Sequence, residues 1–201
     1  MAEEQNGVRI PQQKRSKATK EQIIETAEKL FREKGFHGTN TKEIAAEAGV
    51  AVGSVYAYFH KKKDIYLAVL NGYSERVFRR IPDYSVPPAG TPGRSEHFAG
   101  LLQAIIDAHY APELHRDLYA MYHQDPELRK LVKDWQQKAV REFQGSMEEA
   151  EGTASRDPEA AAVLLHTCIE AVVQHVTMYE ALIGEERIVQ EFSIMLDRYF
   201  T

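Results

Sequence analysis

The chain has 201 residues, of which 43% are hydrophobic and 27% are charged, and its formal net charge is −5. This composition is ordinary for a soluble globular protein with one domain or two closely packed domains. No apolar run approaches the length that spans a bilayer and the N-terminus is polar, so we expect neither a transmembrane helix nor a signal peptide. The single cysteine, Cys168, excludes an internal disulfide and is consistent with a reducing cytoplasm.

The charges are distributed unevenly along the chain. Residues 1–63 hold 12 Lys and Arg against 8 Asp and Glu, a net charge of +4, whereas residues 64–201 hold 13 against 22, a net charge of −9. A basic first third indicates a polyanionic partner at the N-terminal end. An ordinary solvated surface is the alternative, and a nucleic-acid-binding motif nearby decides between the two.

Residues 1–16 lack apolar periodicity and contain Gly7 and Pro11, which predicts a flexible arm. Such an arm could follow a DNA backbone or enter a minor groove, or it could be only a solubilising tail. A helix is predicted from about residue 17 to residue 34, where Gly35 ends it. The end of the arm is basic because it contains Arg9, Lys14, Arg15, Lys17 and Lys20.

The stretch from Thr39 to Lys63 predicts two short helices joined by a tight turn. Asn40 and Glu43 fit a capping box at the start of the first helix. Gly49 fits its C-terminal turn, because glycine tolerates the left-handed conformation needed there. The second helix runs from Val52 to Phe59. This is a helix-turn-helix pattern, in which the second helix enters the major groove of DNA.

At these residues the chain resembles the tetracycline-repressor (TetR) family of one-component bacterial regulators. The resemblance covers roughly the first third of the chain, and so many matches in one register are specific. The remaining two thirds fit the family by length and helical character alone. The matching residues are Ile24, Ala27, Leu30, Phe31, Gly35, Thr41, Ile44, Ala45, Ala48, Gly49, Val50, Gly53, Ser54, Val55, Tyr56, Tyr58, Phe59 and Lys62.

Five polar residues are predicted to contact the DNA backbone. Thr41 and Lys42 lie in the first turn of the first motif helix, where free N–H groups suit a phosphate. The resemblance implies backbone contacts for Tyr56 and Tyr58, with core packing as the alternative for either ring. Lys62, at the start of the next helix, should also meet a phosphate.

The second motif helix has no Arg, Lys, Gln or Asn between Ala51 and Phe59, so it lacks the usual bidentate contacts to base edges. Sequence choice must therefore come from thymine methyl groups, from Lys42, from the arm or from DNA shape. Ala51 also stands where the family commonly has a Ser or Thr cap. The residues that can face bases are Ala51, Val52, Gly53, Ser54 and Ala57.

The pattern beyond residue 61 predicts only helices, so we expect an all-α fold of about nine helices. A helix at residues 62–80 is followed by a Pro- and Gly-rich loop and by five further helices that end near residue 200. The predicted division is an arm at 1–16, a DNA-binding head at 17–63 and an effector-binding and dimerisation body at 64–201. In the family, helix 62–80 joins the head to the body and transmits the ligand signal.

The last two helices predict a homodimer. The helix at about 158–183 is apolar nearly all round, which indicates burial on more than one side. Packing it with helix 185–200 against their two-fold copies gives a four-helix bundle, with a monomeric core as the alternative. The predicted interface residues are Val172, Val176, Tyr179, Ile188, Phe192, Met195 and Tyr199.

The sequence has no catalytic signature, and its eight histidines show no metal-ligand spacing, so we expect no enzyme activity, no metal and no cofactor. The resemblance instead implies an effector site in the body. A polar stripe of His166, Glu170, Gln174 and Thr177 could face a ligand, a dimer mate or solvent. The predicted lining is Tyr110, Leu118, Met121, Tyr122, Trp135, Phe143, His166, Glu170, Gln174 and Met178.

The resemblance therefore predicts a cytoplasmic, homodimeric transcriptional regulator. We expect it to repress by binding a palindromic operator and to be released by an amphipathic small molecule. The alternative is a helical-bundle enzyme or small-molecule-binding protein with an incidental helix-turn-helix, but that alternative leaves Thr41, Tyr56, Tyr58 and Lys62 unexplained.

Overall fold

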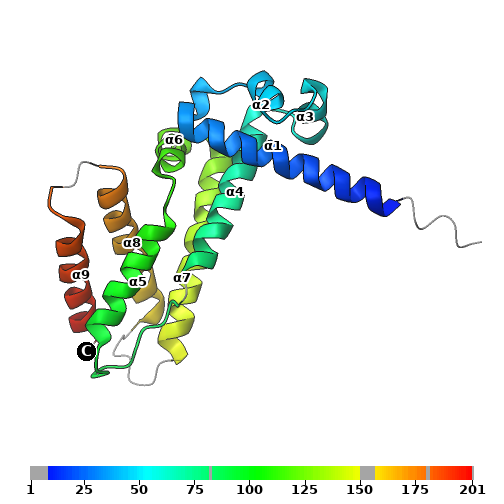
Figure 1. The fold of residues 1–201 in the computed structure, drawn as a ribbon. Coiled ribbons are helices and arrows are strands. Elements are labelled where there is room, and N and C mark those ends of the chain that lie inside the picture. Colours follow the sequence, from blue (N-terminus) through cyan, green and yellow to red (C-terminus); the bar gives the residue numbers. More distant parts are fainter. Residues whose placement is uncertain (1–8, 82, 150–156, 180–181, 201) are drawn as a thin grey trace, which may run out of the picture. The chain divides into compact units, whose positions relative to one another are not determined.

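The computed structural model describes residues 9–81, 83–149, 157–179 and 182–200 of the chain. These residues form nine helices and no strand, which confirms the predicted all-α fold (Figure 1). The helices are α1 (Arg9–Gly38), α2 (Thr41–Glu47), α3 (Val52–Tyr58), α4 (Lys62–Arg80), α5 (Arg94–Ala108), α6 (Pro112–Tyr122), α7 (Pro126–Glu149), α8 (Pro158–Thr177) and α9 (Glu185–Tyr199).

Helix α1 begins at Arg9, eight residues before the predicted start, so a flexible arm is wrong for residues 9–16. Pro11 does not prevent this, because a missing N–H in the first turn of a helix has no intrahelical partner to lose. The rest of the predicted arm, residues 1–8, lies outside the described residues. At the other end, Gly35 interrupts the helix with φ 72° and ψ 169°, a conformation that favours glycine.

Several helix starts follow the predicted capping chemistry. The Asn40 side chain accepts a hydrogen bond from the Glu43 N–H at 3.0 Å, but the Glu43 carboxylate pairs with Lys34 and does not complete the capping box. The Asp157 side chain accepts from the Ala160 N–H at 3.0 Å, one residue before Pro158 opens α8. Ala51 provides no side-chain cap for α3, as its methyl group dictates.

The chain folds as two compact units. The head unit comprises Met1–Tyr73 together with Glu113–Leu118 of α6, and the body unit comprises Ser74–Pro112 together with Tyr119–Thr201. The head unit thus extends ten residues beyond the predicted boundary at 63. Helices α4 and α6 each contribute residues to both units.

The head unit has a closely packed core. Ile23, Ala27 and Phe31 of α1 are fully buried, and so are Ile44 of α2 and Val55 of α3. The Phe31 ring meets the Tyr66 ring edge-on at 5.2 Å. Each large apolar side chain buried in this way contributes about 1.5–3 kcal/mol, so this core fixes α2 and α3 against α1.

The body unit is a helical bundle in which α5 packs on α9 and α7 packs on α8. Helix α8 is the one described helix that is long and apolar enough, by length and composition, to cross a membrane. The expectation that no apolar run reaches this length is therefore wrong. Packing accounts for part of its composition, because Leu165, Ile169 and Val173 are buried in the bundle.

Candidate nucleic-acid interface and ligand pockets

The face of α3 that points away from the core is open to solvent. Val55 and the following Phe59 are buried, whereas Ala51, Gly53 and Ala57 are exposed and Val52 and Ser54 are half-buried. All five residues predicted to face bases are thus at least partly accessible. Their contact with DNA stays a prediction, but no packing role inside the head competes with it.

Gly53 has no internal reason to be glycine. Apart from its chain neighbours and the backbone of its own helix, no atom would lie within 4 Å of a Cβ built on it, and its backbone does not have a positive φ. Glycine within a helix is less stable than alanine by about 0.5–1 kcal/mol, because it loses more conformational freedom on folding. The head therefore carries a small instability here that its own packing does not explain.

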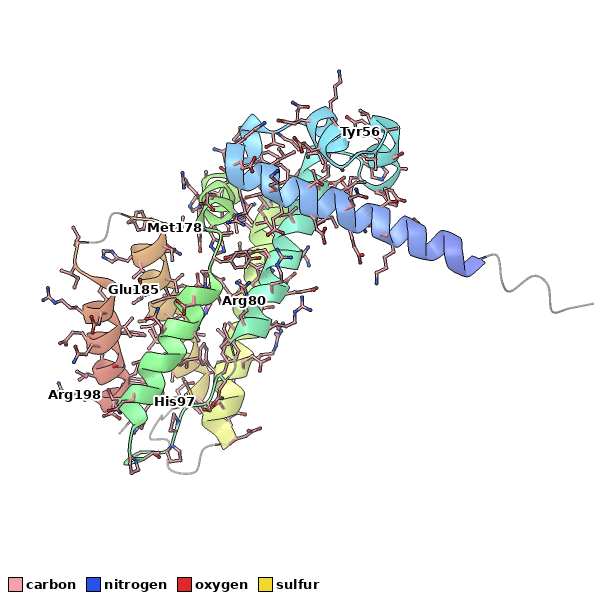
Figure 2. The ribbon with its side chains drawn as sticks, viewed as in Figure 1. Tyr56, Arg80, His97, Met178, Glu185 and Arg198 are labelled. Atoms are coloured by element: carbon pink, nitrogen blue, oxygen red, sulfur yellow. The ribbon has the colours of Figure 1, made fainter. Side chains whose placement is uncertain are left out.

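The two tyrosines of α3 differ in their surroundings. Tyr56 is 51% exposed and lies at the surface of the head (Figure 2), so core packing is not its role. Tyr58 is half-buried, and its hydroxyl lies 3.1 Å from the Ser16 hydroxyl of α1. Thr41 is half-buried and Lys42 is exposed in the first turn of α2, so both remain open to a phosphate.

Lys62 has a structural role that the sequence did not suggest. Its Nζ donates hydrogen bonds to the carbonyls of Phe36 at 2.6 Å and Thr39 at 2.7 Å, and it lies 4.3 Å from the Phe36 ring centroid. Burial lowers the pKa of Lys62, and the Asp117 carboxylate opposes that shift. Because an ammonium group has three donors, one N–H is left for the predicted phosphate contact.

The corner between α1 and α2 is held from several sides within the head unit. The Phe36 N–H donates to Asp117 Oδ2 at 2.5 Å, and the buried Thr39 hydroxyl donates to the Gly35 carbonyl at 2.9 Å. Tyr66 Oη donates to the Leu114 carbonyl at 2.8 Å. These contacts fix the corner from which α2 departs, and they bind the first turns of α6 to the head.

The polar stripe of α8 has an internal partner that the sequence analysis missed. Gln174 Nε2 donates to Tyr119 Oη at 2.9 Å, and Tyr119 Oη donates to Glu170 Oε2 at 3.5 Å. Thr177 donates to the carbonyl of Val173 in its own helix. Tyr119 of α6 is therefore a fourth candidate beside ligand, dimer mate and solvent. No pattern in the sequence marks it, because the pairing joins two helices far apart in the chain.

His166 completes this cluster without completing its own hydrogen bonds. Its Nε2 is buried and has no hydrogen-bond partner. Burial lowers the pKa of His166, Glu170 opposes the shift, and His109 adds to it. A neutral imidazole with an unsatisfied nitrogen costs about 1–3 kcal/mol, which a bound polar group could recover. We call Tyr119, His166, Glu170 and Gln174 the body cluster.

The other predicted effector residues are not brought to one place. Tyr110 accepts a hydrogen bond from Arg76 Nε at 2.7 Å, and the Arg80 guanidinium lies 4.2 Å from its ring centroid. Phe143 is buried in the bundle, and Leu118 belongs to the head unit. Met121, Tyr122, Trp135 and Met178 are half-buried in the body unit.

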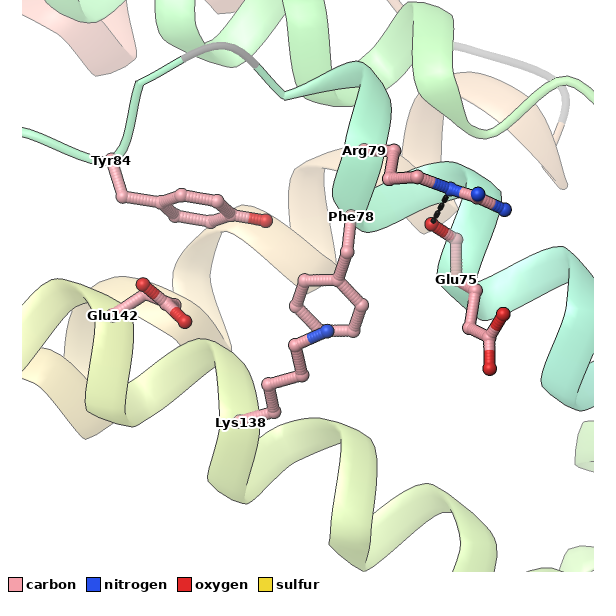
Figure 3. Close-up of a pocket in the computed structure, with 6 residues that line it drawn as sticks. All are labelled: Glu75, Phe78, Arg79, Tyr84, Lys138 and Glu142. Atoms are coloured by element: carbon pink, nitrogen blue, oxygen red, sulfur yellow. Dashed lines mark hydrogen bonds between the residues drawn. The ribbon is translucent and has the colours of Figure 1, made fainter.

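Two pockets in the body unit were not predicted. A pocket of about 350 Å³ is lined by Glu75, Phe78, Arg79, Tyr84, Lys138 and Glu142 (Figure 3). The Tyr84 hydroxyl is buried without a hydrogen-bond partner, and Lys138 Nζ lies 4.0 Å from the Phe78 ring centroid. A groove of about 500 Å³ runs between α7 and α8 and reaches His166 of the body cluster.

Most of the exposed large apolar side chains of the described residues lie on the last two helices and their connection. Of the eight large hydrophobic residues that are exposed in the described chain, Tyr56 lies in the head and the other seven lie on α8, α9 and their connection. Phe192 is not among them, because it is 7% exposed and packs inside the protomer, so its predicted place in the interface is wrong. The seven are Val163, Leu164, Tyr179, Leu182, Ile183, Met195 and Tyr199.

Among the residues that the structure describes, no group of three or more His, Cys, Asp or Glu side chains could hold a metal ion.

The head unit with its open α3 face defines the class of the protein, a helix-turn-helix regulator with a helical body. Two family models identify it further. Bacterial regulatory proteins of the tetR family match residues 23–69, and the tetracyclin repressor-like C-terminal domain matches residues 95–200, more than half of the chain. The chain belongs to the TetR family of transcriptional regulators.

Curated relatives match less than half of the chain. The chain is 46% identical over 59 residues to the regulator YuxN of Bacillus subtilis, covering 29% of this chain and 20% of that protein. It is 36% identical over 91 residues to HbdR of Aromatoleum (43% and 38% covered), and 31% identical over 87 residues to the repressor KstR2 of Mycobacterium tuberculosis (43% and 42% covered). The matches thus span less than half of each relative.

Solved structures share the fold along nearly the whole chain. Salmonella enterica GusR aligns with a TM-score of 0.68 at 19% identity, covering 92% of this chain and 94% of that one. The multidrug binding protein EbrR, complexed with malachite green, aligns with a TM-score of 0.65 at 21% identity, covering 88% and 96%. At these identities the likeness shows the fold alone.

Proposed function

We propose that this protein is a cytoplasmic repressor that binds a palindromic operator as a homodimer and is released by an amphipathic small molecule. The observation that carries the proposal is the open face of α3, where Gly53 and Tyr56 have no role in packing the head. Each protomer thereby has one exposed helix that could bind the major groove of one operator half-site.

The experiment is a gel shift with the DNA that flanks the protein's own gene, at fixed salt, against a scrambled fragment of equal length. We expect specific binding at least a thousandfold tighter than binding to the scrambled DNA, as regulators of this kind require. Equal binding to both fragments would contradict an operator-binding function.

The apolar surface on α8 and α9 supports the homodimer. Seven of the eight exposed large hydrophobic side chains lie on α8, α9 and their connection, a concentration on two helices that a partner surface would explain. A second copy would cover them, and a palindromic operator requires such a dimer, with its two α3 helices about 34–36 Å or a multiple apart. The half-buried Val172, Val176 and Ile188 lie on the same two helices and complete the proposed interface.

Met195→Glu is expected to convert the dimer to a monomer. Met195 is 49% exposed in the protomer, so the protomer itself tolerates the change, but the interface would bury two unpaired carboxylates. We expect the dimer dissociation constant to rise more than a hundredfold, about 3 kcal/mol, by analytical ultracentrifugation.

Gln190→Glu is the matched control, because Gln190 is exposed and lies about 140° around α9 from Met195. Phe192→Glu should instead unfold the protomer, since Phe192 is in its core. A dimer that survives Met195→Glu unchanged would place the interface elsewhere.

The body cluster supports a site for the polar end of an effector. The unsatisfied His166 Nε2 and the carboxylate of Glu170 offer hydrogen bonds there, and the groove between α7 and α8 reaches His166. The structural neighbour EbrR is described with malachite green bound, which supports a ligand with a large apolar part. An amphipathic molecule would match both features.

Release would act through α4, which contributes residues to both units. An effector must bind the DNA-incompetent state better than the competent one, and operator DNA must weaken effector binding by the same factor. Any compound that releases the operator in the gel shift is therefore to be titrated by calorimetry with and without operator. Equal affinities would show that the compound does not act through the body.

A further inference from the structure

Helix α1 extends well beyond the core that it supports. Its first fully buried residue is Ile23, and no residue from Ser16 to Gln22 is buried. The helix nevertheless begins at Arg9, so about 21 Å of helix, at 1.5 Å per residue, precede Ile23. Figure 1 shows this part of α1 projecting past α2 and α3 within the head. Residues 16–22 place no buried side chain in the head's core, so core packing does not account for this part of the helix.

The extension is fixed beside the recognition helix. The Ser16 hydroxyl lies 3.1 Å from the Tyr58 hydroxyl of α3, and Lys20 Nζ lies 5.6 Å from the ring centroid of Phe59. Gln22 Nε2 donates to the carbonyl of Ala48, at the end of α2, at 2.9 Å. These three contacts hold residues 16–22 of α1 beside the two helices that would meet DNA.

The extension is also strongly basic. Residues 9–20 contain five Lys and Arg and no Asp or Glu. Lys17 has an exposed partner, Glu21, at 3.9 Å, and such a surface pair is worth at most about 1 kcal/mol and leaves the positive field largely intact. A helix segment that has no apolar stripe and carries one sign of charge gains little stability from its own side chains. A polyanion along it would supply the missing interactions.

We propose that the N-terminal extension of α1, residues 9–20, binds the DNA phosphate backbone beside the half-site read by α3, and does so as a helix. The inference rests on the proposed operator binding. A helix with side chains is about 10–12 Å across and cannot enter a minor groove about 6 Å wide, and α3 already fills the major groove at the half-site. The extension therefore follows the backbone, and it adds salt-dependent affinity without adding sequence choice.

The test is a triple variant, Lys14→Gln, Arg15→Gln and Lys17→Gln, titrated with operator and with scrambled DNA over a range of salt. Each lost phosphate contact flattens the slope of log affinity against log salt by about 0.9. We therefore expect the slope to flatten by up to about 2.7, equally for operator and scrambled DNA. The ratio of specific to non-specific affinity should stay the same. An unchanged slope, or a changed ratio, would overturn the proposal.

A body variant with the same change in charge is the control: Lys130→Gln, Lys133→Gln and Arg141→Gln, all exposed on α7. It should leave the slope as in the wild type. If the wild type itself binds no DNA, the proposed function fails. If the wild type binds and the triple variant keeps its slope, only the present inference fails.

A second variant tests the helical form without removing charge. Ala18→Pro removes a backbone donor and clashes with the carbonyl four residues earlier, which costs about 3 kcal/mol within a helix. Ala18 is exposed, so the head core from Ile23 onward stays intact. We expect the slope to flatten as in the triple variant. Wild-type binding by this variant would mean that the segment acts as a flexible tail, and it would overturn the helical proposal.

Discussion

Gly53→Ala is expected to stabilise the protein and to weaken its DNA binding at the same time. Beyond its chain neighbours and its own helix backbone, the added methyl group meets no atom within 4 Å, and Gly53 lies in α3 without a positive φ, so nothing else in the head opposes it. Helix propensity then adds about 0.5–1 kcal/mol to the free energy of unfolding. The same methyl group projects from the open face of α3 to where a base pair would approach closely.

We expect a loss of at least tenfold in operator affinity, about 1.4 kcal/mol, by fluorescence anisotropy, together with a raised unfolding temperature. Gly100→Ala is the matched control, because Gly100 is an exposed helical glycine of α5 with no atom near its added Cβ. It should stabilise by a similar amount and leave DNA binding unchanged. Wild-type operator affinity in Gly53→Ala would show that α3 does not approach DNA with this face.

Local chemistry made most of the fold predictable. Pro126 and Pro158, each preceded by an aspartate, mark the starts of α7 and α8, and the Asp157 side chain caps α8. The helix-turn-helix followed from Asn40 and from Gly49, whose φ is 63°. These features depend on residues within one turn of each other, and a single sequence contains all of that information.

The errors arose where distant parts of the chain meet. The extension of α1 has no apolar periodicity, yet it is helical because it continues a helix that the head core already fixes. Glu170 and Gln174 find Tyr119 on another helix. Phe192 lies three residues before Met195, at helical spacing, yet Met195 is exposed and Phe192 packs inside the protomer. Apolar periodicity does not say which neighbour buries a side chain. The two pockets were not predicted because their lining residues come from segments far apart in the chain.

Lys62→Met is expected to destabilise the head unit, whereas the same substitution at the exposed Lys42 is not. The substitution keeps the length of the side chain but removes both hydrogen bonds to the carbonyls of Phe36 and Thr39. Each partly buried carbonyl left without its charged donor costs about 1–3 kcal/mol, and water recovers part of this, so we expect a loss of about 2–4 kcal/mol. Thermal unfolding and hydrogen exchange of residues 36–41 measure it.

Lys42→Met is the matched variant, since Lys42 is exposed in the first turn of α2 and has no hydrogen bond or ion pair within the described chain. Its unfolding should be unchanged. Both variants, measured below the unfolding transition, should flatten the dependence of log affinity on log salt by about one unit, because each is predicted to lose one phosphate contact.

The two measurements separate the roles of one ammonium group. Two of the N–H donors of Lys62 stabilise the corner that precedes α2, and the third is the one available to a phosphate. Loss of stability with an unchanged salt slope would make Lys62 purely structural, and Lys42 would then be the sole lysine contact of the motif. A flattened slope with unchanged stability would contradict the two carbonyl contacts. Lys62 both holds the corner and contacts DNA if Lys62→Met loses stability and flattens the salt slope. Lys42→Met should then flatten the slope without losing stability.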